Sequence, residues 1–306
     1  MNETDSLFQL LDPADRAAIG KELILPSHSY WKDAWERLKE NRPAFFALIT
    51  LCVLIVLAIF APLLSSYTYY ETQLQLKNTP PCFKFWFGTD EIGRDLFIRC
   101  WWGARISLFV GISASIIDLA IGVLYGALAG FLGGKREELM MQIADILYSI
   151  PYLLVVILLM VVIGPGIGTL IIALTLTGWI NMARIVRSQI LQIKQMDFVQ
   201  AATALGASNW RILIHHLIPN AMGSIIVTVT LTIPSAIFAE AFLSFLGLGV
   251  QAPIASWGTM VNDGLSALRY YPWRLLFPAT LISLTMLSFN LLGDGLRDAF
   301  DPRLRK

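Results

Sequence analysis

Long uncharged apolar runs, separated by charged stretches, dominate the pattern of this chain. Crossing about 30 Å of hydrocarbon takes roughly 20 apolar helical residues, and the runs provide six segments of suitable length. The predicted spans cover residues 44–64, 106–132, 146–163, 167–183, 221–246 and 275–292. The pattern therefore predicts an all-α polytopic membrane protein with six transmembrane helices.

The third and fourth spans are predicted from a single run. Residues 146–183 contain no charged side chain, and this stretch is too long for one crossing. The segment Gly164-Pro165-Gly166-Ile167-Gly168 divides it with residues that break helices. We expect a tight hairpin there, and we expect Pro151, Pro234 and Pro278 to bend their spans.

Composition supports a membrane protein. Of the 306 residues, 56% are hydrophobic and 15% are charged, so one soluble core cannot bury all of the apolar surface. The formal net charge of +1 is too balanced to indicate a nucleic-acid partner. No apolar segment with a small-residue cleavage site precedes residue 44, so we expect the first span to be an uncleaved anchor.

The distribution of Lys and Arg predicts the orientation, because these residues collect in loops that stay in the cytoplasm. With both ends inside, 16 of the 23 Lys and Arg residues lie on the inner side. We expect a multi-pass membrane protein with both termini cytoplasmic. Its parts are a cytoplasmic N-terminal segment (1–43), a transmembrane domain (44–293) and a cytoplasmic tail (294–306).

A helix on the inner membrane surface is predicted just before the first span. Trp31, Trp35 and Leu38 recur at helical spacing, and Lys32 and Lys39 are among the charged residues at the other positions. Tryptophans at headgroup depth favour an interfacial helix. A solvated helix is the alternative.

The longest inner loop, residues 184–219, has a regular pattern. Phe198, Ala201, Ala202 and Leu205 follow the i, i+3, i+4, i+7 spacing of one helical face. Gly206 can adopt the left-handed conformation that ends such a helix. The loop therefore begins with a short amphipathic helix.

A second short helix follows in the same loop. Ser208 can cap it, and Trp210, Leu213, Ile214 and Leu217 continue it until Pro219 interrupts it at the membrane. Packing on its own bundle, a DNA-binding helix-turn-helix and docking to a cytoplasmic partner are the possible roles. Too few basic residues are present for DNA, and the small residues at the turn favour docking.

The residues of this loop also resemble a family. Gln200-Ala201-Ala202-Thr203-Ala204-Leu205-Gly206, followed by Pro219, is similar to the EAA loop of ABC importer permeases. The departure is Gln200, which stands where the family usually has Glu and loses its charge. Other matching segments are 87–95 (FGTDEIGRD), 242–249 (FLSFLGLG), 293–298 (GDGLRD) and 182–187 (MARIVR). Together they resemble the dipeptide, oligopeptide and nickel permease group, and most closely its oligopeptide permease C subunits.

The resemblance implies a type I ABC importer permease fold (MetI-like) that forms half of a translocation pathway. The implied partners are a homologous B-type permease subunit, two ABC ATPase subunits, an extracytoplasmic peptide-binding protein and membrane lipid, with no nucleic acid. The loop residues implied to couple to the ATPase are Asp197, Phe198, Gln200, Ala201, Ala202, Leu205, Gly206, Ala207 and Ser208.

Catalysis is expected in the partner chains rather than here. Gly134-Lys135 is not a phosphate loop, because Ala129 stands where the first glycine should be and Arg136 follows the lysine. We therefore expect this chain to bind no cofactor, with ATP and Mg²⁺ held by the ATPases. The adjacent His215 and His216 point in different directions on a helix, so we expect no metal site.

Ionisable residues inside the spans are the remaining candidates, because an ionised side chain in hydrocarbon is costly. Asp118, Asp145 and Glu240 should face the bundle interior or a partner helix. For Glu240 a pathway or subunit-interface role competes with a hydrogen bond that only fixes packing. Trp179 and Asn181 are further candidate pathway residues, although interfacial anchoring also explains the tryptophan.

Outside the spans, a short stretch mixes both signs of charge. Asp90, Glu91, Arg94 and Asp95 either contact the binding protein or form local ion pairs on a solvated helix. Cys82 and Cys100 lie in one extramembrane stretch and are either bridged or two unrelated thiols.

Two other classes of protein are less consistent with the sequence. An ion-coupled secondary transporter would use Asp118 and Glu240 as proton carriers. The paired-helix inner loop argues against it, as does the lack of a second, inverted half with broken helices. An intramembrane enzyme would need a catalytic constellation that the sequence lacks.

Overall fold

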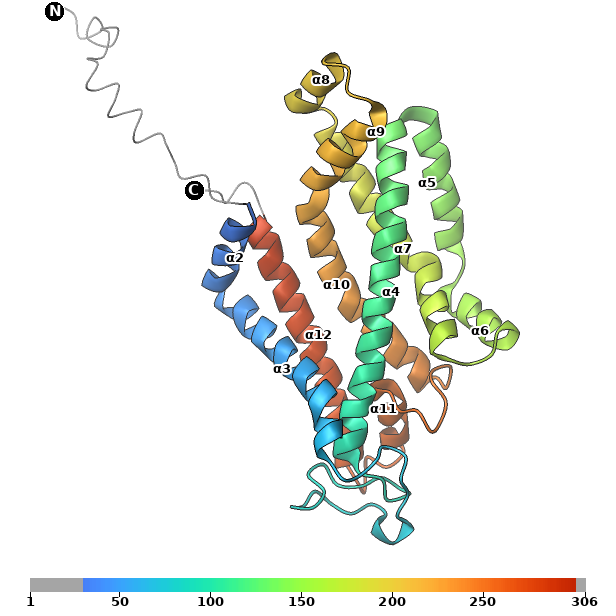
Figure 1. Ribbon diagram of the computed structural model, residues 1–306. Helices are drawn as coiled ribbons and strands as arrows, with labels where there is room; N and C mark the ends of the chain where they lie inside the picture. The colour runs from blue at the N-terminus through green and yellow to red at the C-terminus, as the bar shows by residue number, and fades with distance from the viewer. Residues whose placement is uncertain (1–29, 301–306) are drawn as a thin grey trace, which may run out of the picture.

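The computed structural model describes residues 30–300. The N-terminal residues 1–29 and the last six residues of the predicted tail, 301–306, lie outside the described residues. Within them the chain is almost entirely helical, and the helices form an elongated bundle (Figure 1). Helices α8 and α9 lie at one end, which we call the α8 end, and α11 lies toward the other, the α11 end.

Five helices are long and apolar enough to cross a membrane, and there are six candidate crossings if a bent pair of helices counts as one. The elements are α2 (Tyr30–Glu40), α3 (Arg42–Leu64), α4 (Leu96–Leu132), α5 (Gly134–Ser149), α6 (Tyr152–Val162), α7 (Ile167–Ile193), α8 (Asp197–Ala204), α9 (Asn209–Ile212), a π-helical turn (Leu213–Leu217), α10 (Ile218–Phe245), α11 (Trp257–Leu265) and α12 (Trp273–Phe300). The six-helix fold class predicted from the apolar runs is confirmed.

The second span is longer than its apolar run. Helix α4 begins at Leu96 rather than Ile106, because the Asp95 side chain accepts a hydrogen bond from the Phe97 N–H (2.8 Å) and caps the helix. The extra turns contain charged residues such as Arg99, which hydropathy assigns to a loop. At 1.5 Å per residue, α4 is roughly 55 Å long and extends well beyond the hydrocarbon.

The third span was predicted as one helix over 146–163, and this is wrong. The crossing consists of α5 and α6, which meet at an angle of 75°. Pro151 at the break has no N–H and disfavours helical geometry in the preceding Ile150, so its predicted bend is confirmed. Helix α5 begins at Gly134, and its first turns are charged. A search for apolar runs therefore did not include them in the span.

The fifth span was predicted to begin after an interruption at Pro219, and this is also wrong. Helix α9, the π-helical turn and α10 form one continuous rod from Asn209 to Phe245. The wider π turn directly before the proline relaxes the i→i−4 hydrogen-bond ladder that Pro219 cannot join. The second helix of the loop therefore continues directly into a membrane span.

The α4–α7 pair is the centre of the bundle. A Cβ atom added to Gly126 would lie 2.3 Å from the Ala183 carbonyl oxygen, and at Gly122 and Gly130, one turn away on either side, it would lie 2.6 Å and 2.9 Å from the nearest atom of α7. Small residues spaced by four allow helix backbones to approach closely in membranes. A second apolar cluster lies around the fully buried Trp257 of α11, whose indole N–H donates to the Cys100 carbonyl (2.9 Å).

Helix α2 packs on the end of α12. Its Ala34 and Leu38 are buried against Ala299 and neighbouring residues, whereas Trp31 and Trp35 are largely exposed. This two-sided pattern is compatible with the predicted interfacial helix, whose contact with lipid stays a prediction. Of the two alternatives for Cys82 and Cys100, the structure supports two unrelated thiols. Cys100 is buried in α4, Cys82 is exposed, and neither forms a disulfide bond.

Candidate functional site

The predicted inner loop is mostly helical in the structure. Helix α7 continues to Ile193, ten residues beyond the predicted end of its span, so the loop proper begins at Lys194. Helices α8 and α9 with their intervening turn, residues 197–212, then project at the α8 end of the bundle (Figure 1). We call this segment the α8–α9 tip.

The turn of the α8–α9 tip is closed by backbone hydrogen bonds. Gly206 has a φ of +81°, the left-handed conformation that favours glycine. The Ala207 N–H donates to the Ala202 carbonyl and the Gly206 N–H donates to the Thr203 carbonyl, both at 3.0 Å. These are the two bonds of a Schellman motif, so the predicted glycine-terminated helix is confirmed.

The second half of the turn is also capped as predicted. The Ser208 side-chain oxygen accepts a hydrogen bond from the Arg211 N–H at 3.3 Å, at the start of α9. Backbone groups at the end of α8 and at the beginning of α9 thus have hydrogen-bond partners. The tip is therefore a defined shape rather than a slack loop.

The outer surface of the α8–α9 tip is apolar. Leu205 is 89% exposed and Trp210 is 61% exposed, and Phe198 is also exposed. The inward contacts come from Val199 and Ile212, which are buried. Large apolar side chains gathered on an exposed, rigid tip are typical of a protein interaction site.

The other predicted members of the tip lie on or near its surface. The α8 residues Asp197, Gln200 and Ala201 are exposed, and Ala202 and Ala207 are partly exposed. The Gln200 amide group donates to the Gln195 carbonyl at 3.1 Å, so its side chain is held on the α8 side of the tip.

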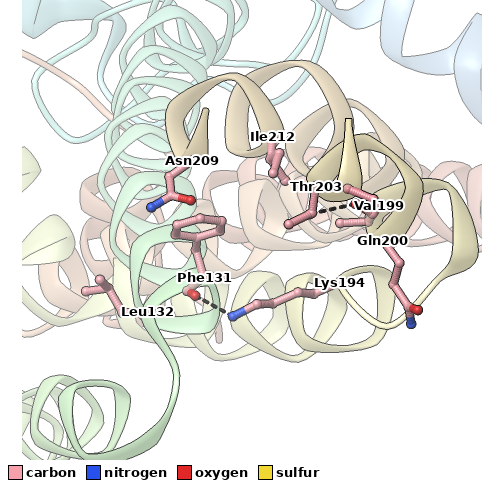
Figure 2. A pocket seen from close by; sticks show the side chains of 9 residues that line it. Phe131, Leu132, Lys194, Val199, Gln200, Thr203, Asn209 and Ile212 are labelled. Carbon is pink, nitrogen blue, oxygen red and sulfur yellow. Dashed lines mark hydrogen bonds between the residues drawn. The ribbon is translucent and has the colours of Figure 1, made fainter. Parts of the chain in front are cut away.

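A groove of about 650 Å³ lies beneath the tip, between α8, α9 and the ends of α4 and α7 (Figure 2). Lys194 crosses its floor, and its ammonium group donates to the Phe131 carbonyl at 2.6 Å and lies 5.2 Å from the Phe131 ring centroid. This lysine ties the end of α7 to the end of α4. Sequence reasoning missed it, because a single lysine after an apolar helix is an ordinary snorkelling residue.

Glu240 does not line a surface. It is fully buried in α10, where its carboxylate accepts hydrogen bonds from Ser107 (2.8 Å, from α4) and Ser244 (2.7 Å). Ser107 also accepts from the Trp257 N–H at 3.3 Å, which connects the cluster to α11. Of the two roles predicted for Glu240 in this chain, the structure favours fixing the packing of α4, α10 and α11.

The other three candidate pathway residues divide into two groups. Trp179 is buried and donates to the Leu176 carbonyl at 3.0 Å, and its ring packs edge-to-face on Tyr125. Asn181 and Asp145 are exposed. Asp145 therefore does not face the interior of its own bundle; its carboxylate pairs with Arg184 of α7 at 2.6 Å.

The predicted binding-protein contacts are mostly internal. Asp90 and Asp95 are buried, and the Arg94 side chain is only 11% exposed, so a surface patch made of all four residues is wrong. Glu91 alone presents an exposed carboxylate. The contact itself stays a prediction for Glu91.

These charges belong to an ion-pair network at the α11 end that connects the loop before α4 with α11 and α12. Its members, which we call the charge network, are Asp90, Glu91, Arg94, Arg99, Asp263 and Arg274. Asp90 accepts from the guanidinium groups of Arg94 (2.6 Å) and Arg99 (3.0 Å). Buried Arg274 pairs with Glu91 at 2.7 Å and also bonds to Asn78.

Desolvation is the largest influence on the pKa of two carboxyl groups at the α11 end. Burial raises the pKa of Asp263, with a further rise from the neighbouring Glu91 charge that Arg94 and Arg274 oppose. Burial also raises the pKa of Asp95, against the lowering effect of the backbone N–H bonds it accepts as a helix cap. Arg99, Arg274 and Asp263 were not predicted as a cluster, because they are far apart in the sequence.

No group of three or more potential metal ligands occurs within residues 30–300. The His215 and His216 side chains lie in the π-helical turn.

Comparison with known proteins agrees with this arrangement. Residues 122–306 match the family described as the binding-protein-dependent transport system inner membrane component. The chain belongs to this family. Residues 29–81 match the N-terminal transmembrane domain of oligopeptide transport permease C.

Individual members of the family are similar over nearly the whole chain. The oligopeptide transport system permease protein OppC of Bacillus subtilis is 57% identical over 96% of both chains. The dipeptide transport system permease protein DppC of the same organism is 58% identical over 92% of this chain and 88% of its own. OppC of Escherichia coli K12 is 42% identical over 93% and 95%. The chain is thus a permease subunit of an ABC importer and a multi-pass inner membrane protein.

Proposed function

We propose that this chain is the C-type permease subunit of an ATP-driven importer of oligopeptides or dipeptides, and that the α8–α9 tip is its coupling site for a separate ATPase. The observation that carries the coupling role is the exposed apolar surface of a tip whose turn is closed by its own backbone. The peptide cargo is inferred from relatives named as oligopeptide and dipeptide permeases.

The tip has a direct mechanical route into the bundle. Helix α9 continues through the π-helical turn into α10, and Lys194 joins the other side of the groove to α4. A force on the tip would therefore reach two spans without passing through a flexible loop. Closure of an ATPase pair around such tips would rock the spans and open the pathway on the opposite side.

The remaining partners follow from this assignment. A homologous B-type permease completes the pathway, two ATPases bind ATP and Mg²⁺, and an extracytoplasmic peptide-binding protein delivers cargo at the α11 end. The α8 end and both termini are cytoplasmic, as the positive residues predict. This chain itself catalyses no reaction.

Replacing Gly206 with Val tests the coupling role. A β-branched residue is strained at a φ of +81°, so we expect the variant to insert in the membrane but to lose the ATPase subunits on purification and to lose peptide uptake. Gly247 is a matched control: it has a φ of +79°, and an added Cβ meets nothing within 4 Å at either glycine.

Gly247→Val should retain the ATPases, because Gly247 lies near the α11 end, far from the tip. Full ATPase binding by Gly206→Val would refute the coupling role. Uptake that persists in ATP-depleted vesicles with an imposed proton gradient would instead favour an ion-coupled transporter.

A further inference from the structure

An exposed ion pair joins α5 to α7. The Arg184 guanidinium bonds to the Asp145 carboxylate at 2.6 Å, yet the two side chains are 39% and 60% exposed. The guanidinium also lies 4.6 Å from the ring centroid of Tyr148, one turn further along α5. This pair is accessible, in contrast to the buried pairs of the charge network.

The pair lies within the helices rather than at their ends. Asp145 is about 16 Å along the axis from Gly134, the first residue of α5, and Arg184 is about 14 Å from Ile193, the last residue of α7. The pair therefore lies away from the helix ends, directly beside the uncharged runs 146–163 and 167–183.

Each partner has exposed polar neighbours on its own helix face. Residues three or four positions apart share a helix face. Among these positions, Gln142 and Ser149 accompany Asp145, and Asn181 and Ser188 accompany Arg184, all four of them exposed. We call Gln142, Asp145, Ser149, Asn181, Arg184 and Ser188 the polar seam.

Lipid cannot cover the polar seam. Charged side chains in hydrocarbon are expensive and line water-filled cavities or contact protein. Packing a second protein tightly over an ion pair would require desolvating both charges, which their attraction often does not repay. The neighbouring row of exposed Leu139, Ile143 and Ile146 on α5 is better suited to lipid or to a second permease.

We propose that the polar seam lines the translocation pathway and that the Asp145–Arg184 pair discriminates among peptides by charge. This inference rests on the proposed importer function. Asp145 would attract ammonium groups of the cargo and Arg184 would attract carboxylates, and the paired state would hold neither too tightly. A zwitterionic peptide can exchange with both partners at once.

The test uses the whole complex in vesicles with its binding protein. Uptake is measured for tripeptides of equal length that carry either Lys or Glu side chains, at concentrations that saturate the binding protein. Asp145→Asn should lower the Lys-to-Glu uptake ratio by about threefold, and Arg184→Gln should raise it by about the same factor, as expected for exposed charges.

Glu137→Gln is the matched control. Glu137 pairs with Arg187 on the same two helices, but its side chain is only 11% exposed. This variant should change the uptake of both peptides equally. Unchanged ratios in Asp145→Asn and Arg184→Gln would overturn the proposal.

Accessibility provides an independent readout. Cys introduced at Asn181, in a background where the exposed Cys52 and Cys82 are replaced by Ser, should react with a hydrophilic maleimide in the assembled complex. Failure to react, with labelling of Cys at exposed Glu138 as a positive control, would mean that a second subunit covers the seam and would overturn the pathway role.

The importer function is tested separately. ATP-dependent peptide uptake that does not require this chain would refute the proposed function. Uptake that requires the chain but is insensitive to both charges would refute the polar seam alone.

Discussion

The two ends of the bundle differ in which side chains they expose and which they bury. At the α8 end, apolar side chains such as Leu205 and Trp210 are exposed on a tip held by backbone hydrogen bonds. At the α11 end, charged side chains such as Arg99 and Arg274 are buried in a network that connects three separate segments. An exposed apolar tip adds little to the stability of the chain and is available to a partner, whereas a buried charge network makes its surroundings rigid.

The largest expected effect comes from breaking the charge network. Asp90→Ala would leave the buried guanidinium groups of Arg94 and Arg99 without the carboxylate that they share, and loss of one partner of a buried pair costs about 3–5 kcal/mol. We expect a lower midpoint of unfolding in detergent, measured by thermal denaturation. A shift no larger than that of the exposed Asp145→Asn would contradict the contrast between buried and exposed pairs.

The Glu240 cluster should be next in size. Glu240→Ala leaves the buried Ser107 and Ser244 hydroxyls without their acceptor, and an unsatisfied buried polar group costs about 1–3 kcal/mol. Glu240→Gln retains an acceptor oxygen and should lose much less stability. If both variants retain full stability but lose uptake, Glu240 acts in transport rather than in packing.

The α8–α9 tip should behave in the opposite way. Leu205→Ala removes an exposed side chain, so the free energy of unfolding should change by no more than about 0.5 kcal/mol. Binding of the ATPase should fall about tenfold, as for an apolar interface anchor. Titration of purified ATPase against the permease complex measures the affinity, and Ile214→Ala, outside the tip, is the control.

The smallest effect concerns pH at the α11 end. Folding raises the pKa of Asp263 above its ordinary value of 3.8, so the folded state favours the protonated form. Its contribution to stability is therefore complete below pH 3.8 and is lost as pH rises through the folded-state pKa. Asp263→Asn should flatten this part of the pH profile by less than about 1 kcal/mol, since the side chain is 45% exposed. A stability that depends more steeply on pH in Asp263→Asn than in the parent protein would contradict the raised pKa of Asp263.

Local pattern predicted much of the tip. The glycine turn at Gly206 and the cap at Ser208 follow from short-range backbone chemistry, which neighbouring residues decide. Prediction failed where one local signal was taken as a helix boundary: Pro219 was expected to stop a helix, but a π turn carries the helix through it. The charged beginning of α5 likewise concealed half of a broken span.

The polar sites show the same limit. Asp90, Arg94 and Asp95 read as a mixed surface stretch, because their buried partners Arg99, Asp263 and Arg274 come from later parts of the chain. Asp145 was expected to face inward, but its exposure depends on where α7 places Arg184.

The sequence by itself showed that lipid surrounds most of the chain, which segments are long enough to cross it, and how the turn of the α8–α9 tip is built. Hydropathy, helix length and turn chemistry are local properties. Only the tertiary structure decided which charges are buried in the α11 end and which are exposed along α5 and α7. The physical reason is that the cost of a charge depends on its surroundings, and helices distant in sequence provide those surroundings.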